Sequence, residues 1–226
     1  MRILFVRHGE PDYAHDCLTE EGRRQAAAAA ERLAGEDISE IYASPLGRAA
    51  ETASYTAERL KLPVTTLDFM HEISWGGEGI PEDGKPWRLG GRMIRENYDF
   101  RGQDWRAHPF FQGNPAREDY ENIAARFDEF LAGQGYRHAG SRFLCEAGTE
   151  KTVALFSHGG SSSCALSHIL ALPFPYVNAV MSCGYTSVTI VNLPAESGEY
   201  VHPRIELLND CGHIRRLPEG GNPHGA

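Results

Sequence analysis

The amino-acid sequence predicts an α/β protein: a three-layer α/β/α sandwich with a mostly parallel central sheet and a largely helical insertion over the end that carries the site. Short apolar runs alternate with helix-like segments, which is typical of a parallel sheet covered on both faces. Two apolar runs, Ile3–Val6 and Val153–Phe156, are each followed within two residues by a histidine. The carboxyl ends of parallel strands are where catalytic side chains gather in such folds.

The first helix is indicated by a capping residue and a change in composition. Thr19 offers a hydroxyl to cap a helix, and Glu20 and Glu21 place negative charge in its first turn, where the helix dipole favours it. Alanines then dominate the stretch from Gln25 to Leu33, and Gly35 ends it. The sequence therefore predicts one helix directly after the first strand and its loop.

The rest of the sandwich follows the same alternation. We expect further strands at 38–43, 62–67, 153–157, 186–193 and 204–208, and further helices from Ser44-Pro45 to Leu60 and at 161–172. Residues from about 75 to 140 break the rhythm with glycine, proline and all three tryptophans, followed by a helix with apolar Tyr120, Ile123, Ala124, Phe127 and Leu131. We interpret them as an insertion, a lid or specificity subdomain, within a single domain of residues 1–226.

Charge and composition narrow the function classes. The formal net charge of -9 argues against non-specific binding to nucleic acid or to a membrane surface, because such binding needs a cationic field. No run of about 18 apolar residues occurs. The five cysteines are widely spaced with no C-x-x-C pair, so we expect free thiols and a cytoplasmic protein.

The two strand-end histidines suit phosphoryl chemistry. The imidazole of His8 is a plausible nucleophile near neutral pH, since its unperturbed pKa is about 6.5. Arg7 beside it supplies a planar donor for phosphate oxygens, and Arg48 lies at the start of a predicted helix. Taken singly, Arg7-His8, Arg48 and the glycine-rich turn around His158 also fit structural or solvated roles, so the interpretation depends on their combination.

Three motifs provide that combination. The chain contains Arg7-His8-Gly9-Glu10, then Ser-Pro-Leu-Gly-Arg-Ala-Ala-Glu-Thr-Ala over 44–53, then Ser157-His158-Gly159-Gly160. In order and approximate spacing these segments resemble the hallmark motifs of the histidine phosphatase superfamily, also called the phosphoglycerate-mutase-like family. Similar segments at 18–26, 118–126 and 209–213 extend the resemblance over most of the chain.

The resemblance implies a role for each motif residue. It implies that His8 takes the phosphoryl group, and that Arg7, Arg48, His158 and Gly159 bind the phosphate. It also implies a proton donor after the third strand, and that position matches Glu72. A carboxylic acid there would protonate the leaving alcohol and then activate water. Such a reaction needs neither a metal nor another cofactor.

The chain also departs from the family pattern. The segment after Glu72 is one residue shorter than usual, so Glu78 is a competing candidate for the acid. Many relatives place a phosphate-binding asparagine shortly after the first motif, whereas this chain has Pro-Asp-Tyr-Ala-His at 11–15. Either the phosphate site has one donor fewer or another residue replaces it, and His15 and Asp16 are candidates to touch substrate.

The remaining polar groups are open to two interpretations. Arg88, Arg92 and Arg95 share one face if their segment is helical, and they either reach a second anionic group of the substrate or form a solvated face. Further histidines show no metal-binding spacing such as H-x-x-x-H, and we expect structural or solvated roles for them; these are His71, His138, His168, His202 and His213.

The leading hypothesis is a phosphatase that hydrolyses a phosphate monoester of a small molecule through a phosphohistidine at His8. A phosphoglycerate-type mutase uses the same catalytic set and is the first alternative. Mutase relatives carry a Glu-Arg-His-Tyr-Gly run at the acid, whereas this chain has Glu-Ile-Ser-Trp-Gly at 72–76, which favours hydrolysis. A non-catalytic phospholigand-binding protein is the alternative from another class. The sequence leaves the substrate and the oligomeric state open.

Overall fold

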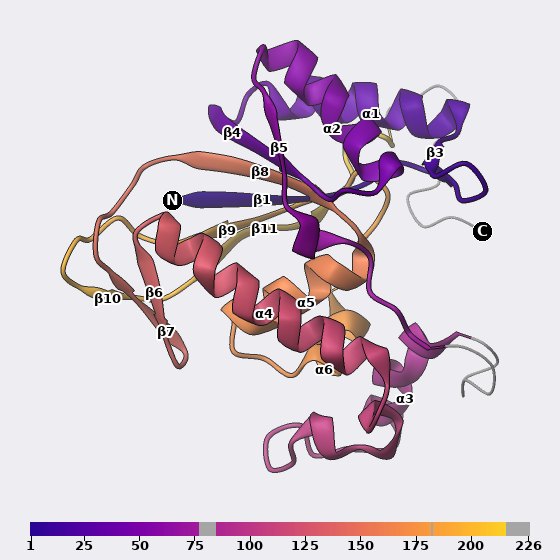
Figure 1. The fold of residues 1–226 in the computed structure, drawn as a ribbon, viewed down its shortest axis with the longest axis vertical. Coiled ribbons are helices and arrows are strands. Elements are labelled where there is room, and N and C mark those ends of the chain that lie inside the picture. Colours follow the sequence, from indigo (N-terminus) through magenta and orange to yellow (C-terminus); the bar gives the residue numbers. More distant parts are fainter. Residues whose placement is uncertain (77–84, 182, 216–226) are drawn as a thin grey trace.

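A six-stranded sheet with the strand order β11-β9-β1-β8-β4-β5 forms the centre of the molecule (Figure 1). The computed structural model describes residues 1–76, 85–181 and 183–215. The sheet strands are β1 (Arg2–Arg7), β4 (Ile38–Ala43), β5 (Val64–Thr66), β8 (Thr152–Ser157), β9 (Val188–Asn192) and β11 (Arg204–Asp210). All six strands were predicted, with boundaries that differ by at most two residues.

The sheet is mostly parallel, as predicted. Strands β1, β8, β4 and β5 run parallel to one another, whereas β9 pairs antiparallel with β1 and β11 antiparallel with β9. In the β1–β8 pair, Arg7 lies opposite Ser157. The register therefore places the residues that follow the two strands, His8 and His158, side by side at the same end of the sheet.

Helices cover both faces of the sheet, which makes the three predicted layers (Figure 1). Helices α1 (Glu20–Leu33) and α2 (Gly47–Leu60) cover one face. The other face carries α4 (Pro115–Gly133), α5 (Gly159–Ile169) and α6 (Phe174–Val180). Alternate residues of the buried strands enter two separate cores, because successive strand side chains point to opposite faces. Leu4 and Val6 belong to the α1–α2 core, and Ile3 and Phe5 to the other.

The predicted helix ends are set by local chemistry. The Thr19 hydroxyl accepts a hydrogen bond from the Gly22 N–H at 3.0 Å and caps α1. Helix α5 begins at Gly159, two residues earlier than predicted, because His158 already has the extended backbone of a capping residue. It ends three residues early, and Ala171 adopts a left-handed φ of 51°. Helix α6 was not predicted, since it is short and begins in a proline-rich segment.

The insertion between β5 and β8 contains the predicted long helix α4, whose five apolar residues named above are all buried. It also contains α3 (Leu89–Arg95) and several short turns of helix. Trp105 and Phe111 are buried and pack around Phe174 of α6. These aromatic residues thus belong to the same core as Ile3 and Phe5, on the α4–α5 face of the sheet. The short 3₁₀ helices are η1 (Asp68–Met70), η2 (Pro86–Arg88), η3 (Trp105–Ala107) and η4 (Pro109–Phe111).

Two small sheets complete the described structure. One is a hairpin of β2 (Pro11–Asp12) and β3 (Cys17–Leu18), and the other joins β6 (Tyr136–Ala139), β7 (Arg142–Cys145) and β10 (Tyr200–Val201). Neither was predicted, because strands of two to four residues give no recognisable alternation. All five cysteines are free thiols, as expected.

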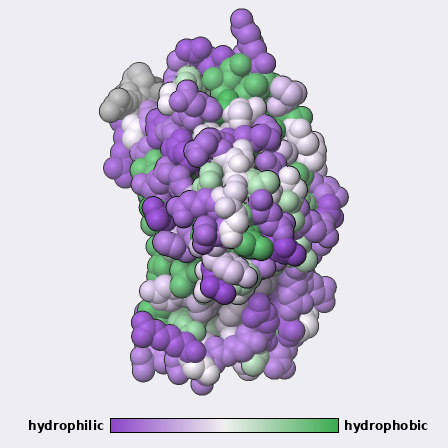
Figure 2. Space-filling view, turned by 90° about the vertical axis from the view of Figure 1, so that its left-hand side faces the viewer, coloured by the Kyte–Doolittle hydropathy of each residue, from purple (hydrophilic) through white to green (hydrophobic). Residues whose placement is uncertain are grey.

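The surface agrees with the charge of the chain. Figure 2 shows a face on which hydrophilic residues predominate and hydrophobic ones gather only in small groups. Within 1–76, 85–181 and 183–215, no helix combines the length and the apolar character needed to cross a bilayer.

Candidate active site

The two motif histidines meet at the carboxyl end of the sheet. The His8 N–H donates a hydrogen bond to the Ser157 carbonyl at 2.9 Å, which continues the β1–β8 ladder by one residue. The imidazole ring centroids of His8 and His158 lie 5.1 Å apart. Both side chains are buried, with 1% and 0% of their surface exposed. The structure therefore unites two motifs that lie 150 residues apart in the sequence.

Of the two ring nitrogens of His8, only Nδ1 has a hydrogen-bond partner among the residues that the structure describes. Its Nδ1 lies 2.7 Å from the carbonyl oxygen of Gly9, and since a carbonyl only accepts, Nδ1 carries the proton. In the neutral ring, Nε2 then presents a lone pair. Burial, followed by the positive charge of Arg7, lowers the pKa of His8 to about 3. The imidazole is therefore neutral at physiological pH, the form that can act as a nucleophile.

His158 is oriented by Ser44, the first residue of the second motif, to which the sequence assigned no role of its own. Its Nε2 lies 2.8 Å from Ser44 Oγ, at the end of β4. That oxygen also accepts the Leu46 N–H at 3.3 Å, so the serine proton is available to His158 Nε2. Burial, followed by repulsion from His8, lowers the pKa of His158 to about 2. The strand order, which sets β4 beside β8, explains why Ser44 reaches this histidine.

The two arginines are anchored from different sides. Arg7 donates from Nη1 to the carbonyl of Cys183 at 2.6 Å, and its guanidinium carbon lies 4.4 Å from the centre of the Tyr185 ring. Arg48, in the first turn of α2, is 8% exposed. Neither Cys183 nor Tyr185 was singled out in the sequence, since both precede β9 without a motif.

Asp16 fixes Arg48, and it is the main residue of the site whose role the sequence did not specify. Its two carboxylate oxygens accept hydrogen bonds from Arg48 Nη1 and from the Gly47 N–H, both at 2.6 Å. Burial alone would raise the pKa of Asp16, but these hydrogen bonds outweigh it and the pKa is lowered. His15, the other loop candidate, pairs instead with Asp12 and its side chain is 76% exposed. The loop after the first motif thus places a carboxylate on Arg48.

Glu72 lies against the first turn of α5. Its Oε1 accepts hydrogen bonds from the N–H groups of Ile73, Gly160 and Ser161 at 3.0, 3.1 and 3.3 Å. The carboxyl group itself is buried, and this burial raises the pKa of Glu72 in spite of the hydrogen bonds. A carboxyl group with a raised pKa is suited to donate a proton. The competing acid Glu78 lies outside the described residues.

The glycines of the third motif allow this close packing. A Cβ at Gly160 would lie 2.5 Å from Glu72 Oε1, closer than real side chains approach. A Cβ at Gly159 would lie 3.9 Å from Arg7 Nε, so Gly159 sits beside the arginine at the start of α5. The amino end of a helix favours an anion, because its first N–H groups are unpaired and the dipole is positive there.

Three buried polar atoms of these residues have no hydrogen-bond partner in the described parts of the chain. They are Arg7 Nε, Arg48 Nε and His158 Nδ1. Such atoms are uncommon, because an unpaired buried donor costs about 1–3 kcal/mol. Two of the three belong to arginine guanidinium groups, which donate to anions. The geometry is therefore complementary to an anion with several acceptor oxygens.

The chemistry of this site matches one protein family. A model of the histidine phosphatase superfamily (branch 1) matches residues 3–206, which include all three motifs and Glu72. The chain belongs to the histidine phosphatase superfamily. As a member of this superfamily it is 27% identical over 232 residues to a probable phosphoglycerate mutase of Yersinia enterocolitica, a match that covers 95% of each chain.

Solved histidine phosphatase structures share the fold. Mycobacterial glucosyl-3-phosphoglycerate phosphatase matches with a TM-score of 0.66 at 25% identity, over 92% of this chain and 98% of that one. Phosphoserine phosphatase of Entamoeba histolytica, in complex with 3-phosphoglyceric acid, gives a TM-score of 0.66 at 22% identity, over 94% and 98%. The proteins that resemble this chain thus include phosphatases and a probable phosphoglycerate mutase.

The other residues considered from the sequence are exposed, have local partners or stay predictions. Arg88, Arg92 and Arg95 are exposed, and Arg92 pairs with Glu96 at 2.8 Å; a contact of this group with substrate stays a prediction. His202 is exposed. Several other histidines have local partners. His213 lies 2.9 Å from the Thr186 hydroxyl, His71 Nδ1 lies 3.0 Å from the Glu72 carbonyl, and His138 and His168 share Asp128.

Proposed function

We propose that this protein is a phosphatase that hydrolyses a phosphate monoester of a small molecule through a phosphohistidine at His8, with Glu72 as general acid and base. One observation carries the proposal. A buried, neutral imidazole with a free Nε2 lies among three unpartnered polar atoms that can bind phosphoryl oxygens. A site that only bound phosphate would not need a nucleophile held in one tautomer.

In the first step, His8 Nε2 attacks phosphorus. An N–P bond forms as the bond between phosphorus and the ester oxygen breaks, and the Glu72 carboxyl group gives its proton to the departing alkoxide. Arg7, Arg48 and His158 bind the non-bridging oxygens, together with the amino end of α5 at Gly159. Their positive charge and hydrogen bonds stabilise the charge on the transferring group.

In the second step, water completes the hydrolysis. The Glu72 carboxylate accepts a proton from water, whose oxygen bonds to phosphorus as the N–P bond breaks. Inorganic phosphate leaves, and His8 returns to the neutral imidazole while Glu72 is again protonated. The arginines supply the charge that a metal ion supplies in other phosphatases, so the proposed reaction proceeds without one.

An aryl phosphate tests this proposal. We expect the purified protein to release phosphate from para-nitrophenyl phosphate in the presence of a chelator, and His8→Ala to release none. Acid lability of a trapped phosphoprotein, with stability in alkali, would identify the phosphohistidine. The surface variant His202→Ala is the control and keeps full activity. Undiminished turnover by His8→Ala, or dependence on an added metal, would contradict the proposal.

A phosphoglycerate mutase is the second candidate, favoured by the 27% identical relative that carries this name. A mutase returns the phosphoryl group to a second hydroxyl, so it interconverts 2- and 3-phosphoglycerate when bisphosphoglycerate is added. A panel that includes phosphoserine and both phosphoglycerates, assayed for phosphate release and for isomerisation, separates the two activities. Tight binding of these esters without any phosphoenzyme would instead indicate a phospholigand-binding protein.

A further inference from the structure

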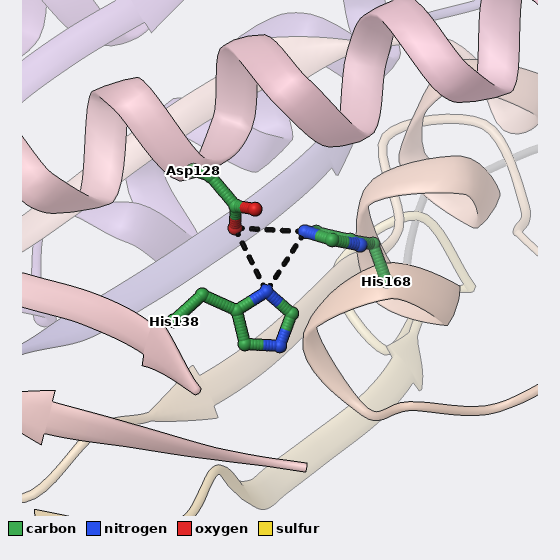
Figure 3. A group of neighbouring side chains, drawn as sticks. All are labelled: Asp128, His138 and His168. Atoms are coloured by element: carbon green, nitrogen blue, oxygen red, sulfur yellow. Dashed lines mark hydrogen bonds and ion pairs between the residues drawn. The ribbon is translucent and has the colours of Figure 1, made fainter. Parts of the chain in front are cut away.

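A second group of polar side chains lies on the α4–α5 face of the sheet. Asp128 of α4, His138 of β6 and His168 of α5 point toward one another from three different elements (Figure 3). Asp128 Oδ1 lies 3.0 Å from His138 Nδ1 and 2.7 Å from His168 Nε2, and the two nitrogens lie 3.1 Å apart. The sequence did not indicate this group, because 40 residues separate its first member from its last.

The tautomer of His138 is set by its other nitrogen. Nε2 lies 2.6 Å from the carbonyl oxygen of Gly140, so Nε2 carries a proton and, in the neutral ring, Nδ1 presents a lone pair. The ring also stacks on Phe143, with centroids 4.7 Å apart and an interplanar angle of 12°. A backbone carbonyl on the second nitrogen is the arrangement that orients metal-binding histidines.

Three atoms that can bind a metal therefore converge on one point. The Nδ1 of His138, the Nε2 of His168 and one carboxylate oxygen of Asp128 all lie within 3.1 Å of one another. Without a metal, a proton between His138 Nδ1 and the Asp128 carboxylate holds these groups together. A metal cation would take the place of that proton and would bond to all three atoms.

We propose that Asp128, His138 and His168 form a Zn²⁺ site with three protein ligands and one open position. Two imidazoles and one carboxylate are a known zinc-binding set, with metal–ligand bonds of about 2.0–2.2 Å. Tetrahedral bonds of that length place the ligand atoms about 3.3 Å apart, a few tenths of an ångström more than the spacing seen here. Small rotations of the side chains suffice for binding.

The surroundings leave the fourth position accessible. A cavity of about 560 Å³ adjoins the group and is lined by both histidines, Ser167, Tyr120 and Arg106. The side chains of His138 and His168 are 15% and 16% exposed, so they are ordered by packing but reachable from solvent. A water molecule or a small ligand entering from the cavity would complete the coordination.

This site is separate from the proposed phosphate site. His168 lies in the last turn of α5, whereas His158 caps its first turn. Ten residues of helix separate the two by about 15 Å. Zinc at Asp128 would therefore cross-link α4, β6 and α5 and would take no part in phosphoryl transfer, so the inference does not depend on the proposed function.

Competition with a chromophoric chelator tests the site directly. After exhaustive dialysis against a chelator, the intact protein should bind one Zn²⁺ more tightly than His168→Ala and Asp128→Asn do. Changes to outer-shell partners alone weaken metal binding by about 10- to 100-fold, so loss of a direct ligand should cost at least that. The controls His202→Ala and His8→Ala should bind zinc like the parent protein.

Thermal unfolding shows whether each variant is folded and whether Zn²⁺ stabilises it. Zn²⁺ should raise the Tm of the parent protein and of His8→Ala, but not that of His168→Ala, with all of them folded at the starting temperature. X-ray absorption of the zinc-loaded protein should show two imidazole ligands. Equal zinc affinity in the parent and in both ligand variants, or no zinc binding by the folded parent, would overturn the proposal and leave a proton-bridged cluster.

Discussion

Glu72 Oε1 accepts a hydrogen bond from the Gly160 N–H at 3.1 Å, and this contact joins the loop after β5 to the amino end of α5. Glu72 occupies a position at a helix start that also favours a bound anion. The carboxyl group is therefore held beside the groups proposed to bind phosphate rather than on a free loop.

We expect Gly160→Ala to displace Glu72. The new Cβ would lie 2.5 Å from Glu72 Oε1 and also 2.5 Å from Ile73 Cγ1, so the loop must move. A misplacement of about 1 Å costs about 100-fold in rate, and kcat should fall by that order. Gly35→Ala is the control, because nothing lies within 4 Å of its Cβ position. A Gly160→Ala enzyme with normal kcat would show that Glu72 needs no such placement.

Glu72→Gln should separate the two roles of this carboxyl group. Loss of a general acid costs about 10²- to 10⁴-fold, so phosphorylation by an alkyl phosphate should slow by that factor. The phenolate of an aryl phosphate can leave without receiving a proton. An aryl phosphate should therefore still give a rapid burst of phenolate, followed by slow hydrolysis of the phosphohistidine. Rapid-quench kinetics measure both steps, with Glu58→Gln on the exposed side of α2 as control. Equal slowing of the burst for both esters would exclude proton donation by Glu72.

Much of this fold was predictable because its signals are local. Apolar runs predicted all six strands of the main sheet, and Thr19 with its following acids marked the start of α1 at the residue where it begins. The antiparallel direction of β9 was not predictable, since pairing direction depends on connections far along the chain. The hairpins escaped notice because two to four residues carry no period.

The residues of the candidate site also fall into those that local sequence signals predicted and those that only the structure revealed. His8, Arg7, Arg48 and His158 were recognised through motifs, in which neighbouring residues identify one another. Ser44 and Asp16 contribute through contacts made across strands or loops, over 114 and 32 residues of sequence. A lone aspartate in a loop gives no signal of the arginine that it will meet. The Asp128–His138–His168 cluster escaped notice for the same reason.

The contact of Asp16 with Arg48 should affect how tightly the substrate binds. Asp16→Ala should raise KM about tenfold, equivalent to about 1.4 kcal/mol, because both hydrogen bonds that fix the start of α2 are lost. Asp16→Asn should lose less, since asparagine keeps hydrogen-bonding atoms and tolerates the left-handed φ of 48°.

The matched control for Asp16 is Asp37→Ala. Asp37 is exposed and has a similar φ of 51°, so its replacement carries the same backbone strain. We expect a small loss of stability and an unchanged KM. Steady-state kinetics with each variant measure KM, and urea unfolding measures the stability. If Asp37→Ala and Asp16→Ala raised KM equally, backbone strain and not the contact with Arg48 would be responsible.

Because His8 and His158 are buried, we expect the folded protein to lose stability in mild acid. The pKa values of His8 and His158 are lowered from 6.5 to about 3 and about 2 by burial. Below pH 6.5 the unfolded chain therefore binds protons that the folded chain excludes, and the free energy of unfolding decreases as pH falls. Each histidine contributes about 1.4 kcal/mol per pH unit once the pH is well below 6.5.

Urea unfolding between about pH 6 and pH 4.5 measures this dependence, in a range where most carboxyl groups still carry their charge. His8→Asn removes one of the two groups, so the slope of unfolding free energy against pH should fall by about 1.4 kcal/mol per pH unit. His158 keeps its own contribution, since burial is the main cause of its lowered pKa. His202→Asn, at an exposed position, should leave the slope unchanged. An identical slope in the parent and in His8→Asn would mean that His8 is protonated in the folded protein, and a protonated imidazole has no lone pair with which to attack phosphorus.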